Sequence, residues 1–301
     1  MGTIANKSFF DDPAGDRADR ASIEAALRGD RRALEDLIRR HQDWIYNIAL
    51  RMVFNRQDAE DIAQEALIKI ITNLSAFEGR SRFRTWAYRI VANHVINMKK
   101  RGAERYFVSF PDYWREIEKT PDMDLPDPGS VPVDLPLIVE ETKIQCMMGM
   151  FLCLGREQRL AFILGEIFNV SDTVAGEILT ISKAGFRQRL SRARRQVYNF
   201  MDEKCGLIRR SNPCHCHRKT RALIESGQID PRHLTFNRDY LHRVRAFSGE
   251  RHRRLESFLD DRCRSLFLDH PFQKAPDFAI AIRNVLSSHE FRDIFDFGDL
   301  R

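Results

Sequence analysis

The stretch covering residues 58–97 constrains the fold of this chain more than any other. It has the sequence DAEDIAQEALIKIITNLSAFEGRSRFRTWAYRIVANHVIN. Its first half repeats apolar residues at helical spacing, in a stripe wide enough to face a core. The members of the stripe are Ala59, Ile62, Ala63, Ala66, Leu67, Ile70, Ile71 and Leu74. Asp58 precedes the stripe as a helix cap, so the spacing predicts a core-facing helix over residues 59–74.

The opposite side of this helix is acidic and polar. It carries Asp61, Gln64 and Glu65. The simpler interpretation is an ordinary solvated helix face. The more specific interpretation is a docking face for a basic partner helix, and helical spacing alone leaves both open.

The second half of the stretch combines cations with aromatic rings. It contains Arg80, Arg82, Arg84, Arg89, Phe83, Trp86 and Tyr88. Cations neutralise phosphates and flat rings stack on unpaired bases, so this pattern is typical of single-stranded DNA binding. Phe83, Trp86 and Ile90 also recur at helical spacing, so some of these rings must belong to the core. Asn93, further along the same helix, suits base-edge contacts as well as capping.

The DAEDIAQE helix, the Phe-x-Gly loop and the FRTWAYRIVANHV helix closely resemble region two of an extracytoplasmic-function (ECF) RNA polymerase sigma factor. In that family the first helix docks on the clamp coiled coil of RNA polymerase. The loop and the next helix melt the −10 element of the promoter and hold a flipped base. The resemblance implies polymerase binding by Asp61, Gln64 and Glu65. It implies −10 DNA binding by Gly79, Arg80, Ser81, Arg82, Phe83, Arg84, Trp86, Arg89 and Asn93.

We expect five segments along the chain. Residues 1–17 are polar and are expected to be a mobile tail, and residues 18–105 form the region-two domain. Residues 106–136 are rich in proline and aspartate, which predicts an extended linker. The resemblance implies that this linker threads the RNA-exit channel of the polymerase. Residues 137–204 form a second helical domain, and residues 205–301 form a C-terminal extension with a helical apolar pattern.

The second domain contains a predicted helix-turn-helix. One short helix covers residues 172–181, and a second helix opens at Ser182. The second helix has no acidic residue between Ser182 and Arg195, which favours a major-groove helix over a merely solvated basic one. Gly176 in the first helix either loosens that helix or permits close packing, and the sequence does not decide between them.

This domain resembles sigma region four, which binds the −35 element. The matching pieces are LGREQR at residues 154–159 and RLSRAR at residues 189–194. The resemblance implies −35 DNA binding by Ser182, Lys183, Arg187, Gln188, Ser191, Arg192, Arg194 and Arg195.

The C-terminal extension begins with a cluster of metal-ligand residue types. Cys214, His215, Cys216 and His217 are consecutive. Their spacing is poor for a zinc finger, which needs two separated ligand pairs. A bound zinc or other metal, a redox-active thiol pair and a structural turn all remain open.

Composition narrows the class of protein further. The chain has 301 residues and a formal net charge of +6, which allows a nucleic-acid partner. No apolar run approaches the length of a membrane span or a signal peptide, and the six cysteines are scattered. We therefore expect a cytoplasmic protein. The sequence has no phosphate-binding loop and no nucleophile–base pair that we can identify, so we do not expect an enzyme.

These patterns predict an all-α, multidomain ECF sigma factor with a C-terminal extension. Its expected partners are bacterial core RNA polymerase, promoter DNA and an anti-sigma factor, with no membrane contact. One alternative is a helix-turn-helix regulator that binds duplex DNA without polymerase. Another is a metal- or redox-sensing protein whose DNA-binding half is secondary.

Overall fold

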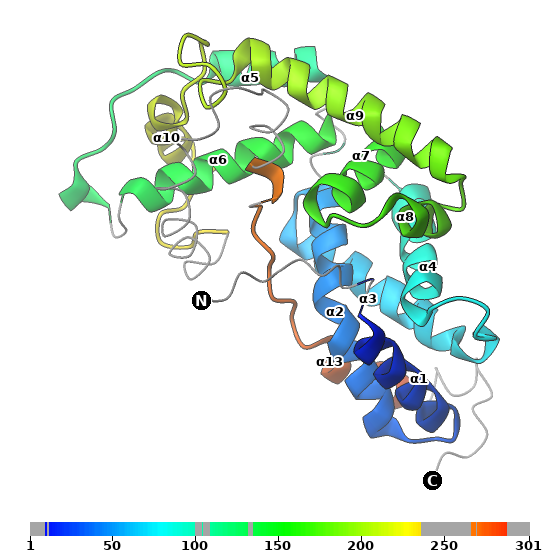
Figure 1. Cartoon of the computed structure of the whole chain (residues 1–301). Coiled ribbons are helices and arrows are strands. Elements are labelled where there is room, and N and C mark those ends of the chain that lie inside the picture. Colours follow the sequence, from blue (N-terminus) through cyan, green and yellow to red (C-terminus); the bar gives the residue numbers. More distant parts are fainter. Residues whose placement is uncertain are drawn as a thin grey trace. The chain divides into compact units, whose positions relative to one another are not determined.

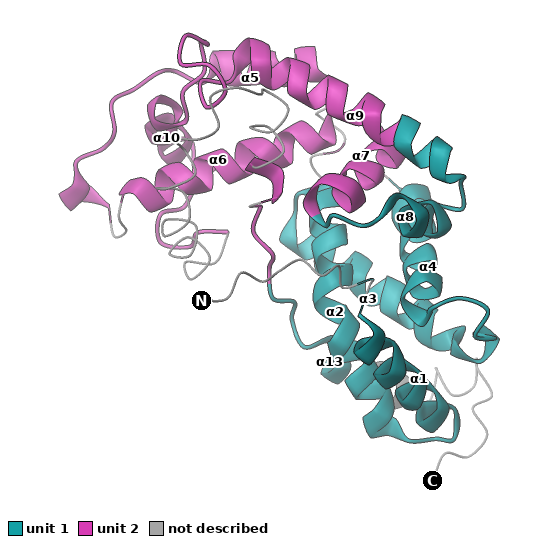
Figure 2. Cartoon of the chain, in the orientation of Figure 1, with its two compact units in different colours: residues 1–102, 168–188, 274–301 teal, residues 103–167, 189–273 magenta. Residues whose placement is uncertain are grey.

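The computed structural model describes residues 10, 12–99, 104, 109–131, 135–235, 266–268 and 270–287. Across these residues the chain is helical (Figure 1), and the one β pairing there is an isolated bridge between Cys205 and Cys214. The all-α prediction is confirmed for this part of the chain. Contacts divide the chain into two compact units (Figure 2). The first comprises residues 1–102, 168–188 and 274–301, and the second comprises residues 103–167 and 189–273.

The first unit is built on four long helices. They are α1 (Pro13–Leu27), α2 (Arg31–Val53), α3 (Arg56–Thr72) and α4 (Phe83–Asn97), with a short 3-10 helix η2 (Leu74–Ala76) between the last two. Side chains of Asp12, Asp30 and Asn55 accept backbone N–H bonds at the starts of α1, α2 and α3. The expected cap of α3 was Asp58. That expectation is wrong, because the Asp58 N–H itself donates to Asn55 Oδ1 at 2.9 Å.

Helix α1 begins inside the segment that we expected to be a mobile tail. Asp12 caps it, and Pro13 fits the first turn, where its missing N–H is not needed. Asp19 and Ile23 on this helix are buried. The tail expectation is therefore wrong from residue 13 onward, while residues 1–9 and 11 lie outside the described part.

The apolar stripes of these helices meet in a common core. Fully or almost fully buried members include Ile45, Ile48 and Met52 from α2, Ala59, Ile62, Ala63 and Leu67 from α3, and Ala87, Val91 and Val95 from α4. Burying one such Ile, Leu or Val side chain contributes about 1.5–3 kcal/mol. This core confirms the predicted stripe of α3 and fixes which side of that helix faces outward.

A helix interrupts the segment that we expected to be an extended linker. Helix α5 (Phe110–Lys119) is capped by Ser109, whose Oγ accepts the Asp112 N–H at 3.2 Å. Pro111 sits in its first turn, where proline is tolerated. Tyr113 is buried, and its hydroxyl donates to the Cys146 carbonyl at 2.9 Å. The linker expectation is therefore wrong for residues 110–119. The later described residues include a single 3-10 turn, η4 (Pro128–Ser130).

The predicted helix-turn-helix is present. Helix α6 (Leu135–Leu152) is followed by α7 (Arg156–Phe162), which continues as a π-helical turn η5 (Ile163–Ile167). Helices α8 (Asp172–Leu179) and α9 (Lys183–Lys204) form the motif. The Ile181 N–H donates to the Gly176 carbonyl at 2.9 Å, and a Cβ on Gly176 would lie 2.9 Å from the Ile181 carbonyl oxygen. Close packing therefore explains this glycine.

Helix α8 packs against α4, so it is grouped with α1–α4 in the first unit. The Arg89 Nε donates to the Glu177 carbonyl at 3.2 Å. Phe168, just before α8, is 3% exposed, and its ring meets Trp44 at a centroid distance of 4.9 Å. The guanidinium of Arg51 lies 5.3 Å from the same ring. These contacts explain why the two units do not follow the expected boundaries at 105 and 137.

The C-terminal extension contributes described elements to both units. Helix α10 (Cys216–Glu225) packs on α6, where the Thr142 and Thr220 hydroxyls are 3.0 Å apart. Phe267 is fully buried, with its ring 4.9 Å from that of Phe162. Helix α13 (Phe278–Ser287) lies beside α2 and α3 in the first unit (Figure 1).

Candidate nucleic-acid and polymerase interface

The acidic side of α3 is outward-facing, as a docking face requires. Asp61 and Glu65 are exposed, and Gln64 is half-buried. One Glu65 oxygen lies 3.2 Å from His94 Nε2 on α4, and Lys69 Nζ donates to His94 Nδ1 at 2.7 Å. These contacts link the candidate polymerase face to α4.

Arg84, expected to bind −10 DNA, is instead buried at 1% exposure. Its guanidinium meets carboxylates of the α1 segment: Nε lies 3.2 Å from Asp19, and Nη2 lies 3.5 Å from Asp12. A Cβ on Gly15 would clash with this guanidinium, so the glycine lets α1 approach it closely. In this structure the charge of Arg84 holds α1 on α4, and its contact with −10 DNA stays a prediction.

Asp19 is the centre of this buried network. It is fully buried, and it accepts hydrogen bonds from Arg40 Nη1 at 2.5 Å and His41 Nε2 at 3.2 Å. Burial would raise the pKa of Asp19, but its hydrogen bonds and the nearby cations outweigh burial and lower it to about 2. Burial lowers the pKa of His41, so that ring is neutral at pH 7. Asp19 therefore stays ionised, with Arg40 and Arg84 as its charge partners.

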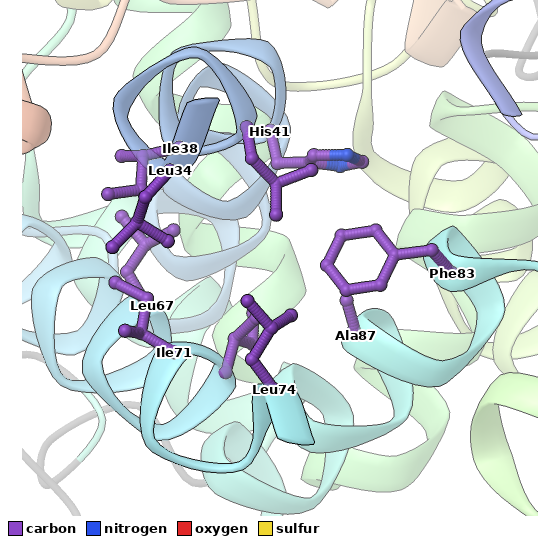
Figure 3. A pocket seen from close by; sticks show the side chains of 10 residues that line it. Leu34, Ile38, His41, Leu67, Ile71, Leu74, Phe83 and Ala87 are labelled. Atoms are coloured by element: carbon purple, nitrogen blue, oxygen red, sulfur yellow. The ribbon is translucent and has the colours of Figure 1, made fainter. Parts of the chain in front are cut away.

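Phe83 also belongs to the core and is not available for base stacking. It is 4% exposed, and its ring meets that of His41 at 5.3 Å and that of Phe77 at 5.4 Å. Figure 3 shows the ring pointing into a small apolar hollow between α2, α3 and α4. The hollow is lined by Leu34, Leu37, Ile38, His41, Leu67, Ile70, Ile71, Leu74, Phe83 and Ala87. With only one polar side chain at its wall, the hollow has no chemistry for binding a polar ligand.

The rest of the predicted −10 residues lie at or near the surface. Gly79, Arg80, Arg82 and Asn93 are exposed, while Ser81, Trp86 and Arg89 are half-buried. Gly79 adopts φ +72°, which explains glycine in the loop. Arg82 is held by the N-terminal segment, because its Nη1 donates to the Phe10 carbonyl at 2.5 Å and its Nε lies 3.3 Å from Asp16.

Most predicted −35 residues share the exposed side of α9. Ser182, Lys183, Arg187, Gln188, Ser191, Arg192 and Arg195 are exposed. The opposite side is buried through Phe186, Leu190, Ala193 and Val197. Ser182 caps the helix, since its Oγ accepts the Gly185 N–H at 3.0 Å. The Arg187 guanidinium forms an ion pair with Asp172 on α8. This geometry is that of a helix able to enter a major groove.

Arg194 is the exception on α9. It forms an ion pair with Glu166, which is fully buried, and the Tyr198 hydroxyl donates to the other Glu166 oxygen at 2.7 Å. Removing Arg194 would leave a buried carboxylate without its cation. Arg194 therefore has a structural role in this unit, and its contact with −35 DNA stays a prediction.

A second carboxylate network was missed from sequence. Glu104 is 3% exposed and accepts hydrogen bonds from Arg156 Nη2 and Arg159 Nη1, both at 2.7 Å. Burial would raise the pKa of Glu104, but the two arginines outweigh it and lower the pKa. The arginines of the region-four-like LGREQR motif therefore bind the start of the chain that leads into this unit. A lone Glu at the end of a basic run gave no signal of this.

The cysteine–histidine cluster does not form a ligand set. Among the residues that the structure describes, no group of three or more His, Cys, Asp or Glu side chains could hold a metal ion. Cys214 lies on the bridge to Cys205, whereas Cys216 begins α10, so neighbouring side chains follow different backbone directions. Burial raises the pKa of the Cys214 thiol to about 11 and that of Cys146 to about 12.

In the described part of the chain, no helix combines the length and apolar character needed to cross a bilayer.

Comparison with known proteins identifies the family. The Sigma-70 region 2 family matches residues 37–105. The ECF RNA polymerase sigma factor SigW of Bacillus subtilis is 30% identical over 184 residues, which covers 57% of this chain and 90% of SigW. The ECF RNA polymerase sigma-E factor of Escherichia coli K12 is 30% identical over 181 residues, covering 60% of this chain and 93% of that protein. A solved structure of CnrH in complex with the cytosolic domain of CnrY aligns with a TM-score of 0.44 at 20% identity, over 62% of this chain and 97% of that chain.

SigW and sigma-E align over at least nine-tenths of their own lengths, and the remaining part of this chain includes residues with no counterpart in them. The chain therefore belongs to the family of ECF RNA polymerase sigma factors.

Proposed function

We propose a division of labour among three surfaces of this sigma factor. Asp61, Gln64 and Glu65 on α3 dock on core RNA polymerase. The loop around Gly79 and the outer side of α4 bind and open the −10 element. The exposed side of α9 binds the −35 element, and the chain performs no catalytic step of its own.

The observation that carries this proposal is that the charged residues on the exposed side of α9, from Lys183 to Arg195, are all basic. Its basic residues are exposed, while Phe186 and Leu190 behind them are 0% and 5% exposed. Because the apolar side of α9 is already buried in the core, its charged side can contact DNA without disturbing the fold. Arginine and lysine in that position supply phosphate contacts, and Gln188 supplies an amide that pairs with a base edge.

The −10 surface that we propose is smaller than the motif alone implies. It consists of Arg80, Arg82, Trp86 and Asn93 around the loop, since Phe83 and Arg84 are buried. The Arg89 Nε donates to the Glu177 carbonyl of α8, so a DNA contact through this nitrogen requires that bond to break.

A cellular location and an inhibitory partner follow from this function. Because bacterial RNA polymerase and promoter DNA lie in the cytoplasm, the chain acts there. An inhibitory partner of the anti-sigma class would block transcription by covering the α3 docking face. Competition between such a partner and core polymerase for the purified chain tests this assignment.

Run-off transcription tests the main proposal. The purified chain is mixed with bacterial core RNA polymerase and fragmented genomic DNA, and the transcript starts are mapped. We expect discrete new starts that share a −35/−10 pair. Glu65→Lys or Gln64→Ala should abolish them, whereas Glu24→Lys, a reversal on exposed α1, should not. Tight duplex binding without initiation would favour the polymerase-independent regulator instead.

A further inference from the structure

The start of α13 is seated on α2 by two backbone hydrogen bonds. The Ala275 N–H donates to Asp43 Oδ1 at 2.9 Å, and the Phe278 N–H donates to Gln42 Oε1 at 3.1 Å. Ala275 lies just before α13 and Phe278 is its first residue, and the Phe278 N–H also donates to the Pro276 carbonyl at 2.8 Å. The two side chains of α2 therefore hold the chain at the point where α13 begins. Gln42 is a polar residue of only 7% exposure, and this contact accounts for its amide oxygen.

Helix α13 presents one apolar side to this seat and another side to water. Phe278, Ala279 and Ile282 are 4%, 1% and 0% exposed, whereas Ile280 is 51% exposed. The Phe278 ring lies 6.4 Å from that of Tyr46 on α2. Ile282 and Ile280 are thus the same residue type on one helix, with Ile282 facing α2 and α3 and Ile280 facing water.

Ion pairs fix the direction of α13 on α2. Arg39 Nη2 lies 3.5 Å from Asp277, and Arg283 Nε donates to Glu35 Oε1 at 2.6 Å. Residue numbers rise along α13 as they fall along α2, so the two helices are antiparallel. Charges of opposite sign at both ends, with apolar residues between them, define a specific helix-binding surface.

This seat adjoins the candidate polymerase face on α3. Helix α13 contacts α3 as well as α2. Burial raises the pKa of Tyr46, which meets Phe278, and Arg56 and Glu60 of α3 lie near enough to its hydroxyl to shift that pKa down and up, respectively. Glu60 lies one turn before Gln64, so the two residues share a side of the helix. A partner helix that docks at Gln64 would therefore approach the surface that α13 covers.

We propose that α13 occupies a helix-binding surface on α2 and α3 that core RNA polymerase also uses, so that polymerase binding displaces α13. The occupant inside the chain shows what the surface accepts: an amphipathic helix with an acidic residue at its start and a basic residue one to two turns later. This inference rests on the proposed function, because it needs polymerase to dock on α3.

Displacement has a measurable consequence for affinity. When the binding-competent state is only partly populated, the apparent Kd rises by the inverse of that population. If α13 is seated in about nine molecules out of ten, releasing it tightens polymerase binding ~10-fold.

The full chain tests this with a matched pair of substitutions on α13. Ile282→Asp places a charge in the seat, and Ile280→Asp places the same charge on the water side. We expect Ile282→Asp to lower the Kd for core RNA polymerase about 10-fold and Ile280→Asp to leave it unchanged. A chain ending at Gln273 lacks α13 and should match Ile282→Asp. Far-UV circular dichroism confirms that each variant is folded.

Charge reversal adds a rescue. Arg283→Glu should tighten polymerase binding, and adding Glu35→Arg should restore the wild-type affinity by re-forming the ion pair. Unchanged or weaker binding by both the shortened chain and Ile282→Asp, with the fold intact, would overturn the inference. Glu65→Lys separates the two proposals: if it weakens binding while α13 variants have no effect, only the α13 inference fails. If Glu65→Lys itself has no effect, the α3 docking proposal fails.

Discussion

Replacing Asp19 with Asn tests whether a buried carboxylate holds α1 on the helix that carries the −10 residues. The substitution keeps the size of the side chain and one of its acceptor oxygens but removes its charge. Arg84, at 1% exposure, would then lack its closest anion, and Arg40 would lose a 2.5 Å partner. We expect α1 to detach locally and the chain to lose stability.

The magnitude follows from the pKa of Asp19. It falls from an ordinary value of 3.8 to about 2 in the folded protein. A difference of ~1.8 pKa units corresponds to about 2.5 kcal/mol of stabilisation at neutral pH. Leaving Arg84 buried without its closest anion adds to this loss, whereas the retained Asn hydrogen bonds reduce it, so we expect about 2–4 kcal/mol in total.

The dependence on pH gives the prediction its sign. A carboxyl with a lowered folded pKa contributes stability above its unfolded pKa and loses that contribution as pH falls through its folded pKa. The difference between wild type and Asp19→Asn should therefore be full above about pH 5 and shrink between about pH 4 and pH 2. Urea unfolding across this range measures the free energy, and hydrogen exchange of α1 amides reports local detachment.

Asp16→Asn is the matched control. Asp16 is on the same helix and lies near both Arg82 and Arg84, but its side chain is 20% exposed. Partly hydrated pairs contribute little, so we expect a loss below about 1 kcal/mol. The reasoning is refuted if both variants lose the same stability, or if the Asp19→Asn deficit does not change with pH.

Three substitutions and one thiol alkylation test separate features. Gly176→Ala puts a Cβ 2.9 Å from the Ile181 carbonyl oxygen, so we expect a loss of about 1–3 kcal/mol and weaker duplex binding, measured by thermal melting and anisotropy. The Cys146 and Cys214 thiols have pKa values of about 12 and 11, so they should alkylate at pH 8 far more slowly than the thiols of the urea-unfolded chain, as mass spectrometry would show. Arg192→Ala should lower the salt slope of DNA affinity by about 1, whereas Arg194→Ala should instead destabilise the fold by about 3–5 kcal/mol. A salt slope lowered equally by both, with stability intact, would contradict the role of Glu166.

Helical periodicity predicted much of this fold. The stripe of α3 and the helix-turn-helix are both present, because burial of apolar residues at a spacing of 3.6 leaves few alternatives. Helix α5 was missed because Pro111 suggested a break. Its apolar residues at 110, 113, 114 and 117 have the spacing of a helix, and proline in a first turn does not oppose one.

Periodicity does not say which distant charges meet. Asp19 and Arg84 are 65 residues apart, and Glu104 and Arg159 are 55 apart, so no local pattern links them. The caps and the glycine contacts have the same limitation. Whether Gly176 loosens or tightens α8 depends on where the Ile181 carbonyl lies, and only the folded chain fixes that position.

The arginines of the two predicted DNA-binding motifs fall into two groups: those paired with a buried carboxylate and those exposed to solvent. Arg84 and Arg194 each face a carboxylate that is fully buried, Asp19 and Glu166. A buried carboxylate without a cation costs several kcal/mol, so such an arginine cannot leave for a phosphate without unfolding its surroundings. Arg192, in contrast, is exposed, and a phosphate contact there requires no structural contact to break. The number of basic residues in a motif is therefore an upper limit on its DNA contacts. Each ion pair with a buried carboxylate lowers the number of arginines that remain available for DNA.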